Sequence, residues 1–169
     1  MTESHEYYME IALEQAQKAL DSGEFPVGCI LVHNNTIVGQ GGREHSLTND
    51  RNELDHAEII ALRDVNSHYP DLDPSGITAY TTLEPCLMCY GALLINQIST
   101  IVYAYEDAMG GGINLPLAHL PPLYRNMDVS IFPYILRQES LELFRTFFKN
   151  PACSYLQNTY LAEYTLSQE

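Results

Sequence analysis

Apolar residues recur at helical spacing near the start of the chain and in strand-like runs soon after. Over residues 5–21 the apolar positions fall on one face of a helix; they are Met9, Ala12, Leu13, Ala16, Ala19 and Leu20. Ser4 can cap the start of this helix, and Gly23 lies just beyond its end. The next stretch, PVGCILVHNNTIVGQG, predicts two strands joined at Asn34-Asn35, because asparagine tolerates the positive φ of a tight hairpin turn.

Strands and helices alternate along the rest of the chain. Residues 43–55 are polar and predict a loop. Further patterns predict helices at 56–66, 86–96 and 136–148, and strands at 77–82, 100–105 and near 128–132. The loop before the last strand contains GGG, which no helix of the phosphate-binding type follows, so we expect a flexible turn there. This order indicates an α/β sandwich around a central mixed sheet.

Composition bears on the number of domains and on the cellular location. A chain of 169 residues that is 46% hydrophobic and 18% charged is typical of one folded domain. No apolar run reaches the roughly 18 residues of a membrane span, and the acidic N-terminus lacks the features of a signal peptide. We therefore expect no membrane partner and a cytoplasmic location, where thiols stay reduced.

The charge balance bears on the substrate. Eight Lys and Arg residues against 22 Asp and Glu residues give a net charge of −14, and the basic residues are scattered. Proteins that bind tRNA or DNA normally present a basic patch to the phosphates. The net charge therefore disfavours a nucleic-acid substrate, although a chain with this net charge can still carry a local basic patch.

Two short motifs carry the candidate chemistry. In LDHAEII, one alanine separates His56 from Glu58 within an apolar run. In TLEPCLMCYGA, Pro85 suits the start of a helix, and Cys86 and Cys89 then lie one turn apart at the positive end of its dipole, which favours thiolates. A Cys-x-x-Cys pair alone also fits a redox site, but redox chemistry does not need the upstream His-Ala-Glu element.

Together the motifs predict a catalytic zinc site. Three protein ligands, here His56, Cys86 and Cys89, are the number that a catalytic zinc uses, with the fourth position open for water. A structural zinc needs a fourth ligand, but Cys29, expected in the core, and Cys153 both lie outside any paired motif. Near a helix start, Glu58 can lie beside the open position and act as the catalytic acid and base.

The order His-x-Glu and then Pro-Cys-x-x-Cys resembles the zinc-dependent nucleobase deaminases. Over about residues 5–148 the chain is similar to the cytidine and deoxycytidylate deaminase superfamily, closest to the branch of tRNA wobble adenosine, guanine and cytosine deaminases. The stretches that carry this resemblance are EFPVGCILVHNN, HAEIIALR, YTTLEPCLMCYGAL, IVYAYEDAMGG and LELFRTFF. It implies a cytidine deaminase-like three-layer α-β-α sandwich with a mixed five-stranded sheet, one Zn²⁺ per subunit and a homodimer. The deaminase domain would span residues 1–149, with 150–169 as its C-terminal tail.

The resemblance also implies substrate contacts. It places the backbone N–H of Ala57, and Pro85, next to the base. The family often carries a substrate-binding asparagine after the second strand, where this chain has Arg43. Either Asn49 or Asn52 replaces that asparagine, or Arg43 is a surface residue.

Three functions fit these observations. The first is hydrolytic deamination of a free base, nucleoside or related small heterocycle to a keto product and ammonia. The second is tRNA adenosine-to-inosine editing, favoured by TLEPC and EDAMGG but disfavoured by the charge and by a tail without Lys or Arg. The third is a catalytically silent zinc-binding partner subunit, against which the presence of Glu58 argues.

The tail itself carries an apolar stripe. Leu156, Tyr160, Leu161 and Tyr164 predict a short helix within residues 153–166. This stripe either packs on the domain or at a dimer interface, or forms a lid of the kind that the resemblance to guanine and cytosine deaminases implies. A lid would suit a small substrate and hinder a bulky RNA loop.

Overall fold

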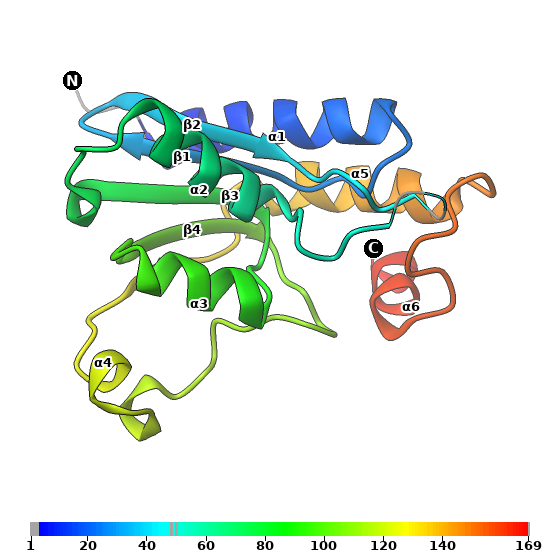
Figure 1. Ribbon diagram of the computed structural model, residues 1–169. Coiled ribbons are helices and arrows are strands. Elements are labelled where there is room, and N and C mark those ends of the chain that lie inside the picture. Colours follow the sequence, from blue (N-terminus) through cyan, green and yellow to red (C-terminus); the bar gives the residue numbers. More distant parts are fainter. Residues whose placement is uncertain (1–3, 48, 50, 169) are drawn as a thin grey trace.

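A mixed sheet forms the centre of the computed structural model, which describes residues 4–47, 49 and 51–168 (Figure 1). In this part of the chain five strands pair in the order β2-β1-β3-β4-β5. They are β1 (Gly28–His33), β2 (Thr36–Gly42), β3 (Ile77–Leu83), β4 (Thr100–Tyr105) and β5 (Ser130–Phe132). β1 is antiparallel to both β2 and β3, whereas β3, β4 and β5 run parallel. The predicted mixed α/β sheet is confirmed.

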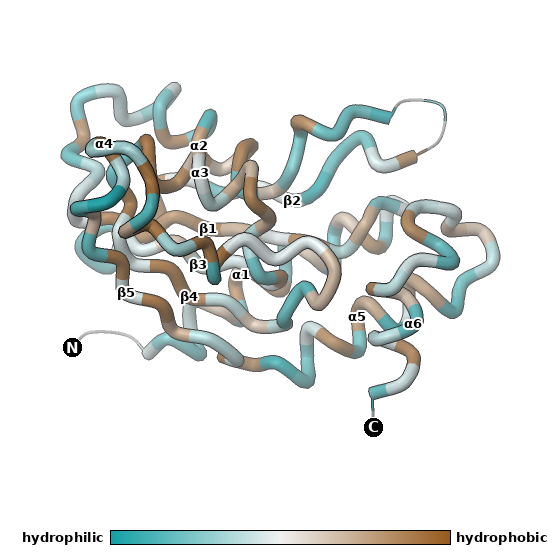
Figure 2. Tube along the Cα trace, turned by 90° about the horizontal axis from the view of Figure 1, so that it is seen from below, coloured by the Kyte–Doolittle hydropathy of each residue, from teal (hydrophilic) through white to brown (hydrophobic). Residues whose placement is uncertain are grey.

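Helices cover both faces of the sheet. α1 (His5–Asp21) and α5 (Arg137–Lys149) lie on one face, and α2 (Ala57–His68) and α3 (Leu87–Ile95) lie on the other (Figure 1). Alternate residues of β1 point to opposite faces. Cys29 and Leu31 belong to the core cluster that includes α2 and α3, whereas Ile30 and Val32 pack with α1. Both faces of β1 are therefore buried, and Figure 2 shows hydrophobic residues along the central strands.

Local signals at the N-terminal end of the chain act as predicted. The side chain of Ser4 caps α1 by accepting a hydrogen bond from the backbone N–H of Tyr7 at 3.3 Å. Asn34 and Asn35 join β1 to β2 with φ angles of 48° and 62°, which is the left-handed turn that the hairpin requires. Cys29 is fully buried, as expected of a core residue.

The glycine run between β4 and β5 begins in a turn, as expected, and its last residue, the buried Gly112, lies against the start of α3. Gly111 pairs with Cys86 in an isolated β-bridge, and the N–H of Gly112 donates to the carbonyl of Pro85 at 2.8 Å. A Cβ atom on Gly112 would lie 2.7 Å from the backbone nitrogen of Leu87. Only glycine therefore lets this segment lie against the start of α3.

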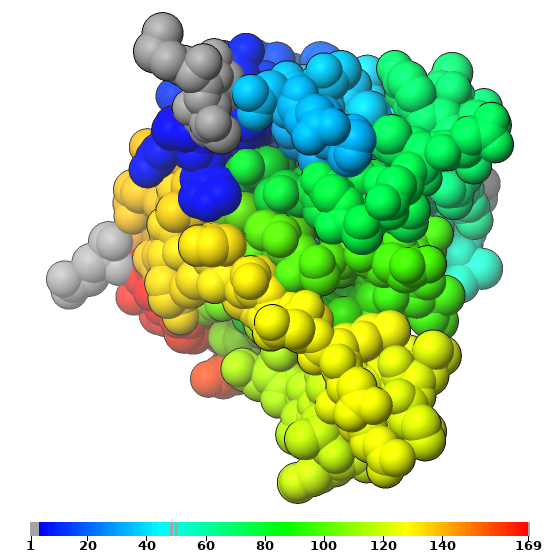
Figure 3. Space-filling view, turned by 90° about the vertical axis from the view of Figure 1, so that its left-hand side faces the viewer, coloured from blue at the N-terminus to red at the C-terminus, as the bar shows by residue number. Residues whose placement is uncertain are grey.

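Short helices occupy the remaining connections. η1 (Pro74–Gly76) precedes β3, and η2 (Leu117–His119) and α4 (Pro122–Arg125) lie between β4 and β5. The segment with η2 and α4 projects from the body of the molecule in yellow (Figure 3). No helix in the described part of the chain has both the length and the apolar character needed to cross a bilayer.

The C-terminal segment folds back against the domain and ends in α6 (Tyr160–Ser167) (Figure 1). This helix is shorter than the range predicted from the sequence, because Leu156 and Asn158 adopt positive φ angles of 54° and 60°. Leu161 is only 1% exposed, and the hydroxyl of Thr165 lies 3.0 Å from that of Tyr105 in β4. The tail therefore packs on the domain, which is one of the interpretations that the sequence left open.

Candidate active site

Both halves of the zinc motif lie where a helix begins. His56 is the N-cap of α2, in extended conformation, and Cys86 is the N-cap of α3; neither side chain makes a capping hydrogen bond. Cys89 follows one turn into α3. A Cβ atom on Gly41 of β2 would lie 2.4 Å from the carbonyl oxygen of Ala57, so this glycine allows the start of α2 to lie close to the sheet.

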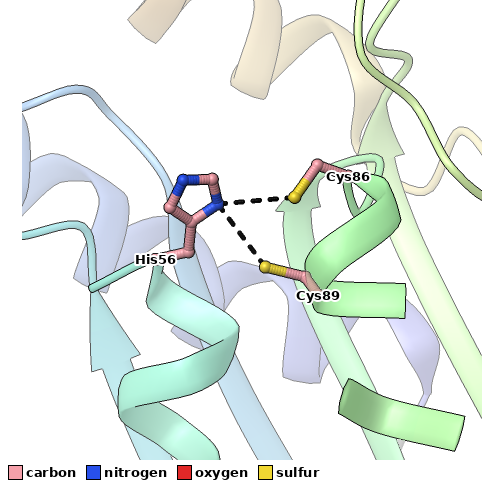
Figure 4. A group of neighbouring side chains, drawn as sticks. All are labelled: His56, Cys86 and Cys89. Atoms are coloured by element: carbon pink, nitrogen blue, oxygen red, sulfur yellow. Dashed lines mark hydrogen bonds between the residues drawn. The ribbon is translucent and has the colours of Figure 1, made fainter. Parts of the chain in front are cut away.

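The three predicted ligands converge (Figure 4). Their ligand atoms all lie within 4.8 Å of one another. Nδ1 of His56 is 3.6 Å from Sγ of Cys86 and 3.5 Å from Sγ of Cys89. Tetrahedral zinc, with bonds of about 2.3 Å to sulfur and about 2.0 Å to nitrogen, separates such atoms by about 3.6 Å. The donor set and its spacing therefore fit Zn²⁺.

The two thiols of this group differ in their tendency to ionise. The hydrogen bond from Cys89, together with the one from His56, lowers the pKa of Cys86 to about 4. The bond with Cys86, and then burial, raise the pKa of Cys89. Burial opposes protonation of His56, but its contact with Cys86 and the charge of Glu58 raise its pKa overall. Zinc binding therefore has to displace the proton of Cys89.

Glu58 lies in the first turn of α2 and is 2% exposed. The hydroxyl of Thr81, in β3, donates to its Oε1 at 3.0 Å. Burial, followed by the negative charge of Cys86, raises the pKa of Glu58. Because His56 precedes the helix, both residues line one cavity although helical geometry alone would turn them apart. A buried carboxyl group with a raised pKa is suited to proton transfer near neutral pH.

A cavity of about 450 Å³, including its opening to solvent, adjoins these residues. Its walls combine the metal-site residues with apolar, acidic and tail side chains: Phe25, Val27, Arg43, His56, Ala57, Glu58, Leu83, Glu84, Cys86, Asp107, Tyr155, Leu156 and Leu161. The tail therefore both packs on the domain and forms one wall of the cavity.

Of the residues predicted to contact the substrate, only Ala57 lines the cavity. Ala57 lines the cavity, and its N–H is among the first of α2, which helix geometry leaves without an internal acceptor. Pro85, Asn49 and Asn52 are not among the lining residues of this cavity. Asn49 is exposed in a turn, and the side-chain amide of Asn52 donates to Asp55 at 2.6 Å.

Arg43 is not a surface residue, so that expectation is wrong. It is 2% exposed and lines the cavity. Its Nη1 donates to three carbonyl oxygens, of Glu44, Asn52 and Asp55, at 2.7, 2.9 and 2.8 Å. These bonds hold the polar loop in place, because one guanidinium group satisfies backbone acceptors from three positions.

Two carboxyl groups in the cavity wall were not singled out from the sequence. Glu84 accepts the N–H of Asp107 at 3.3 Å, and Asp107 accepts the N–H groups of Met109 and Gly110 at 3.0 and 2.8 Å. Burial raises the pKa of Glu84 and that of Asp107. Both residues occur in stretches that carry the family resemblance, but no periodicity marks them as cavity residues.

The family is shown by comparison with known proteins. Residues 2–105 match the family model of the cytidine and deoxycytidylate deaminase zinc-binding region, and the chain belongs to this family. It is an enzyme of the hydrolytic C–N deaminase class with the cytidine deaminase-like fold, and zinc is its cofactor.

Three relatives illustrate the family. The tRNA-specific adenosine deaminase of Streptococcus pyogenes serotype M1 is 30% identical over 148 residues, covering 87% of this chain and 85% of the relative. A solved tRNA:A34 deaminase, described as editing A to I at the wobble position, aligns with a TM-score of 0.70 and 27% identity over 81% of this chain and 98% of that one. Guanine deaminase from Bacillus subtilis aligns with a TM-score of 0.56 and 28% identity over 62% and 66% of the two chains.

Proposed function

We propose that this protein hydrolyses the amino group of a free nucleobase, nucleoside or related small heterocycle to a keto group, with release of ammonia. The observation that carries the proposal is the cavity, where His56 and Cys86 of the ligand triad meet Glu58 and the C-terminal tail. Tyr155, Leu156 and Leu161 close one side of it. A wall formed by the chain itself suits a substrate small enough to be enclosed.

Each side chain of the site has its own role in this reaction. His56, Cys86 and Cys89 would hold zinc, which supplies an activated water molecule when bound. Glu58 takes a proton from the attacking water, delivers it to the ring nitrogen next to the amino-bearing carbon, and later returns a proton to the leaving ammonia. Thr81 orients the Glu58 carboxylate through its hydrogen bond. The N–H of Ala57, a residue of the cavity wall, would bind an acceptor atom of the ring.

Editing of adenosine in tRNA is the second candidate, favoured by the names of the sequence relatives. The charge distribution opposes it. Of the eight Lys and Arg residues, five of the six arginines form salt bridges with carboxylates within the chain, at positions 43, 51, 63, 137 and 145. Charges already paired in this way contribute little to phosphate binding. We therefore place a small heterocycle first.

Ammonia release decides between these candidates. The zinc-loaded protein is assayed with cytosine, adenine, guanine and their nucleosides, and in parallel with a tRNA anticodon stem-loop containing adenosine. Turnover of at least one free base or nucleoside, lost in Glu58→Gln, supports the proposal. Turnover of the stem-loop alone would establish the second candidate instead.

We also propose a homodimer through α3. Leu87, Gly91 and Ile95 recur at four-residue spacing on one side of this helix. Leu87 is 58% exposed and Ile95 is 60% exposed, and a Cβ atom on Gly91 would meet open space. An exposed apolar stripe beside the site residue Cys86 is typical of a protein–protein interface.

Light scattering after size-exclusion chromatography tests the dimer. The double variant Leu87→Glu/Ile95→Glu is expected to run as a monomer with an unchanged circular dichroism spectrum. Tyr7→Glu is the matched control, because Tyr7 is 46% exposed on α1, on the other face of the sheet. A wild-type protein that is already monomeric at micromolar concentration would refute the interface.

A cytoplasmic location is part of the same proposal. All four cysteines are free thiols in the described residues, and two of them belong to the zinc site. Thiols stay available to a metal where glutathione and thioredoxin keep them reduced.

A further inference from the structure

The second ring nitrogen of His56 lies near a carboxylate. Nδ1 is the nitrogen that lies close to the sulfur atoms of Cys86 and Cys89. Nε2 is 3.9 Å from Oε2 of Glu53. Among the described residues, Glu53 is the one carboxylate at ion-pair distance from Nε2. It therefore approaches the ring of a predicted ligand from outside the metal triad.

Three donors hold the Glu53 carboxylate at this place. Oε2, the oxygen nearest His56, accepts hydrogen bonds from the hydroxyl of Tyr155 at 2.8 Å and from Nη2 of Arg43 at 3.2 Å. The other oxygen, Oε1, accepts from Nε of Arg51 at 2.6 Å. The side chain of Glu53 is 51% exposed, and an exposed carboxylate contributes little when it first has to be ordered. Here other partners already order it, so an interaction with His56 loses little further side-chain entropy.

We propose that Glu53 is a positioning residue of the metal site, whose carboxylate accepts the Nε2–H of His56 directly or through one water molecule. A histidine that binds a metal through Nδ1 keeps its proton on Nε2. A carboxylate at that proton fixes the orientation of the ring and makes Nδ1 a better donor to the metal. Since 3.9 Å is longer than a direct hydrogen bond, a small rotation of the ring or one bridging water molecule completes the contact.

The same contact connects metal binding to the C-terminal tail. Tyr155 lies between α5 and α6, and its hydroxyl bonds to the oxygen of Glu53 that is nearest His56. The Tyr155 ring packs against Phe25, with 5.2 Å between the ring centroids, so the domain fixes its position. Retention of zinc should therefore depend on a residue of the tail that is not itself a ligand.

Zinc affinity tests the inference. Each protein is freed of metal, and its dissociation constant for Zn²⁺ is measured by competition with a chromophoric chelator. Glu53→Gln keeps the size of the side chain and removes its charge. This variant is expected to bind zinc about 10-fold more weakly, because carboxylates that support a metal-bound histidine contribute about 10- to 100-fold in affinity. Tyr155→Phe should weaken binding by a smaller factor. Equal affinity in Glu53→Gln and the wild type would overturn the inference.

Two further variants make the result specific. Glu44→Gln is the matched control, because it removes one carboxylate from the same loop at an exposed position that is not paired with His56. It should bind zinc as tightly as the wild type, and an equal loss in Glu44→Gln and Glu53→Gln would reduce the effect to net charge. The inference rests on the proposed role of His56 as a zinc ligand, which Cys86→Ala tests separately. If Cys86→Ala loses zinc while Glu53→Gln keeps it fully, only the positioning role fails.

The ring proton of His56 distinguishes positioning from a general loosening of the loop. In the zinc-loaded protein with ¹⁵N-labelled histidine, nuclear magnetic resonance measures how fast the Nε2–H of His56 exchanges with solvent. Exchange should be slow in the wild type and faster in Glu53→Gln and Tyr155→Phe. Weaker zinc binding with unchanged exchange would make Glu53 a structural residue of the loop only. The wild type decides even if the variants do not fold: exchange as fast as in His68, whose side chain is 70% exposed, would overturn the inference.

Discussion

The phenol oxygen of Tyr155 lies 2.8 Å from the carboxylate of Glu53, although 102 positions separate the two residues. Glu53 also accepts hydrogen bonds from Arg43 and Arg51 at 3.2 and 2.6 Å, and lies 3.9 Å from Nε2 of His56. The C-terminal tail is thus joined to the loop that leads into the metal site. A substitution in the tail should therefore alter the arrangement of side chains in the cavity.

Replacing Glu58 should separate metal binding from catalysis. Glu58→Gln is expected to keep the zinc content of the wild type and to lower kcat by ~10²–10⁴-fold, because the residue transfers protons and is not a ligand. Metal analysis and ammonia release measure the two effects. Glu10→Gln, at an exposed position of α1, should change neither. Retained turnover in Glu58→Gln would remove the residue from the mechanism.

Removing a ligand should abolish metal binding as well as turnover. Cys86→Ala leaves two of the three ligand atoms that converge at the site, and such a set binds zinc weakly. We expect little zinc after dialysis and a lower melting temperature. Cys153→Ala is the control, because this buried cysteine is not part of the ligand group. Equal zinc in Cys86→Ala and the wild type would contradict the assigned ligands.

The cavity wall formed by the tail is best tested by a point substitution. Deleting the whole tail would also expose the core around Leu161, so lost activity would be ambiguous. Leu156→Ala enlarges the cavity from a half-buried position, and we expect KM to rise by about 10-fold through lost apolar contact with the substrate. Leu166→Ala, at an exposed leucine of α6, should leave KM unchanged. Identical KM values in both variants would show that the tail is only a packing element.

Acid should weaken the attachment of α6 through Glu106. The phenol of Tyr164 donates to Glu106 at 2.7 Å, and Arg137 also pairs with this carboxylate. Burial opposes ionisation, but the bonds from Arg137 and Tyr164 lower the pKa of Glu106 below its ordinary value of 4.5. A lowered folded-state pKa stabilises the protein above pH 4.5, and this contribution disappears as the pH falls through the folded-state value.

Urea denaturation at several pH values measures this effect. The difference in the free energy of unfolding between the wild type and Glu106→Gln should be largest above pH 4.5 and shrink below it. Tyr164→Phe, which removes one of the hydrogen bonds, should reproduce part of the difference. A difference that does not depend on pH would mean that Glu106 acts through packing.

The sequence by itself determined the zinc chemistry and the order of the elements. His56, Cys86 and Cys89 occur in two short motifs, and local signals such as Asn34-Asn35 fix turns through the conformation of a few neighbouring residues. Periodicity likewise determined the helices and strands, because it reports which positions face a core. The metal triad could be predicted since its residue types are rare in that spacing and its chemistry is specific.

Only the tertiary structure decided what surrounds that triad. Arg43 looked like a surface residue because its partners, three backbone carbonyls, leave no trace in the sequence. Asp107 and Tyr155 reach the cavity through β4 and the folded-back tail, and such contacts between distant segments follow from packing, which periodicity does not report. The ligands of the metal are therefore encoded locally, whereas the walls that select the substrate depend on how the whole chain packs.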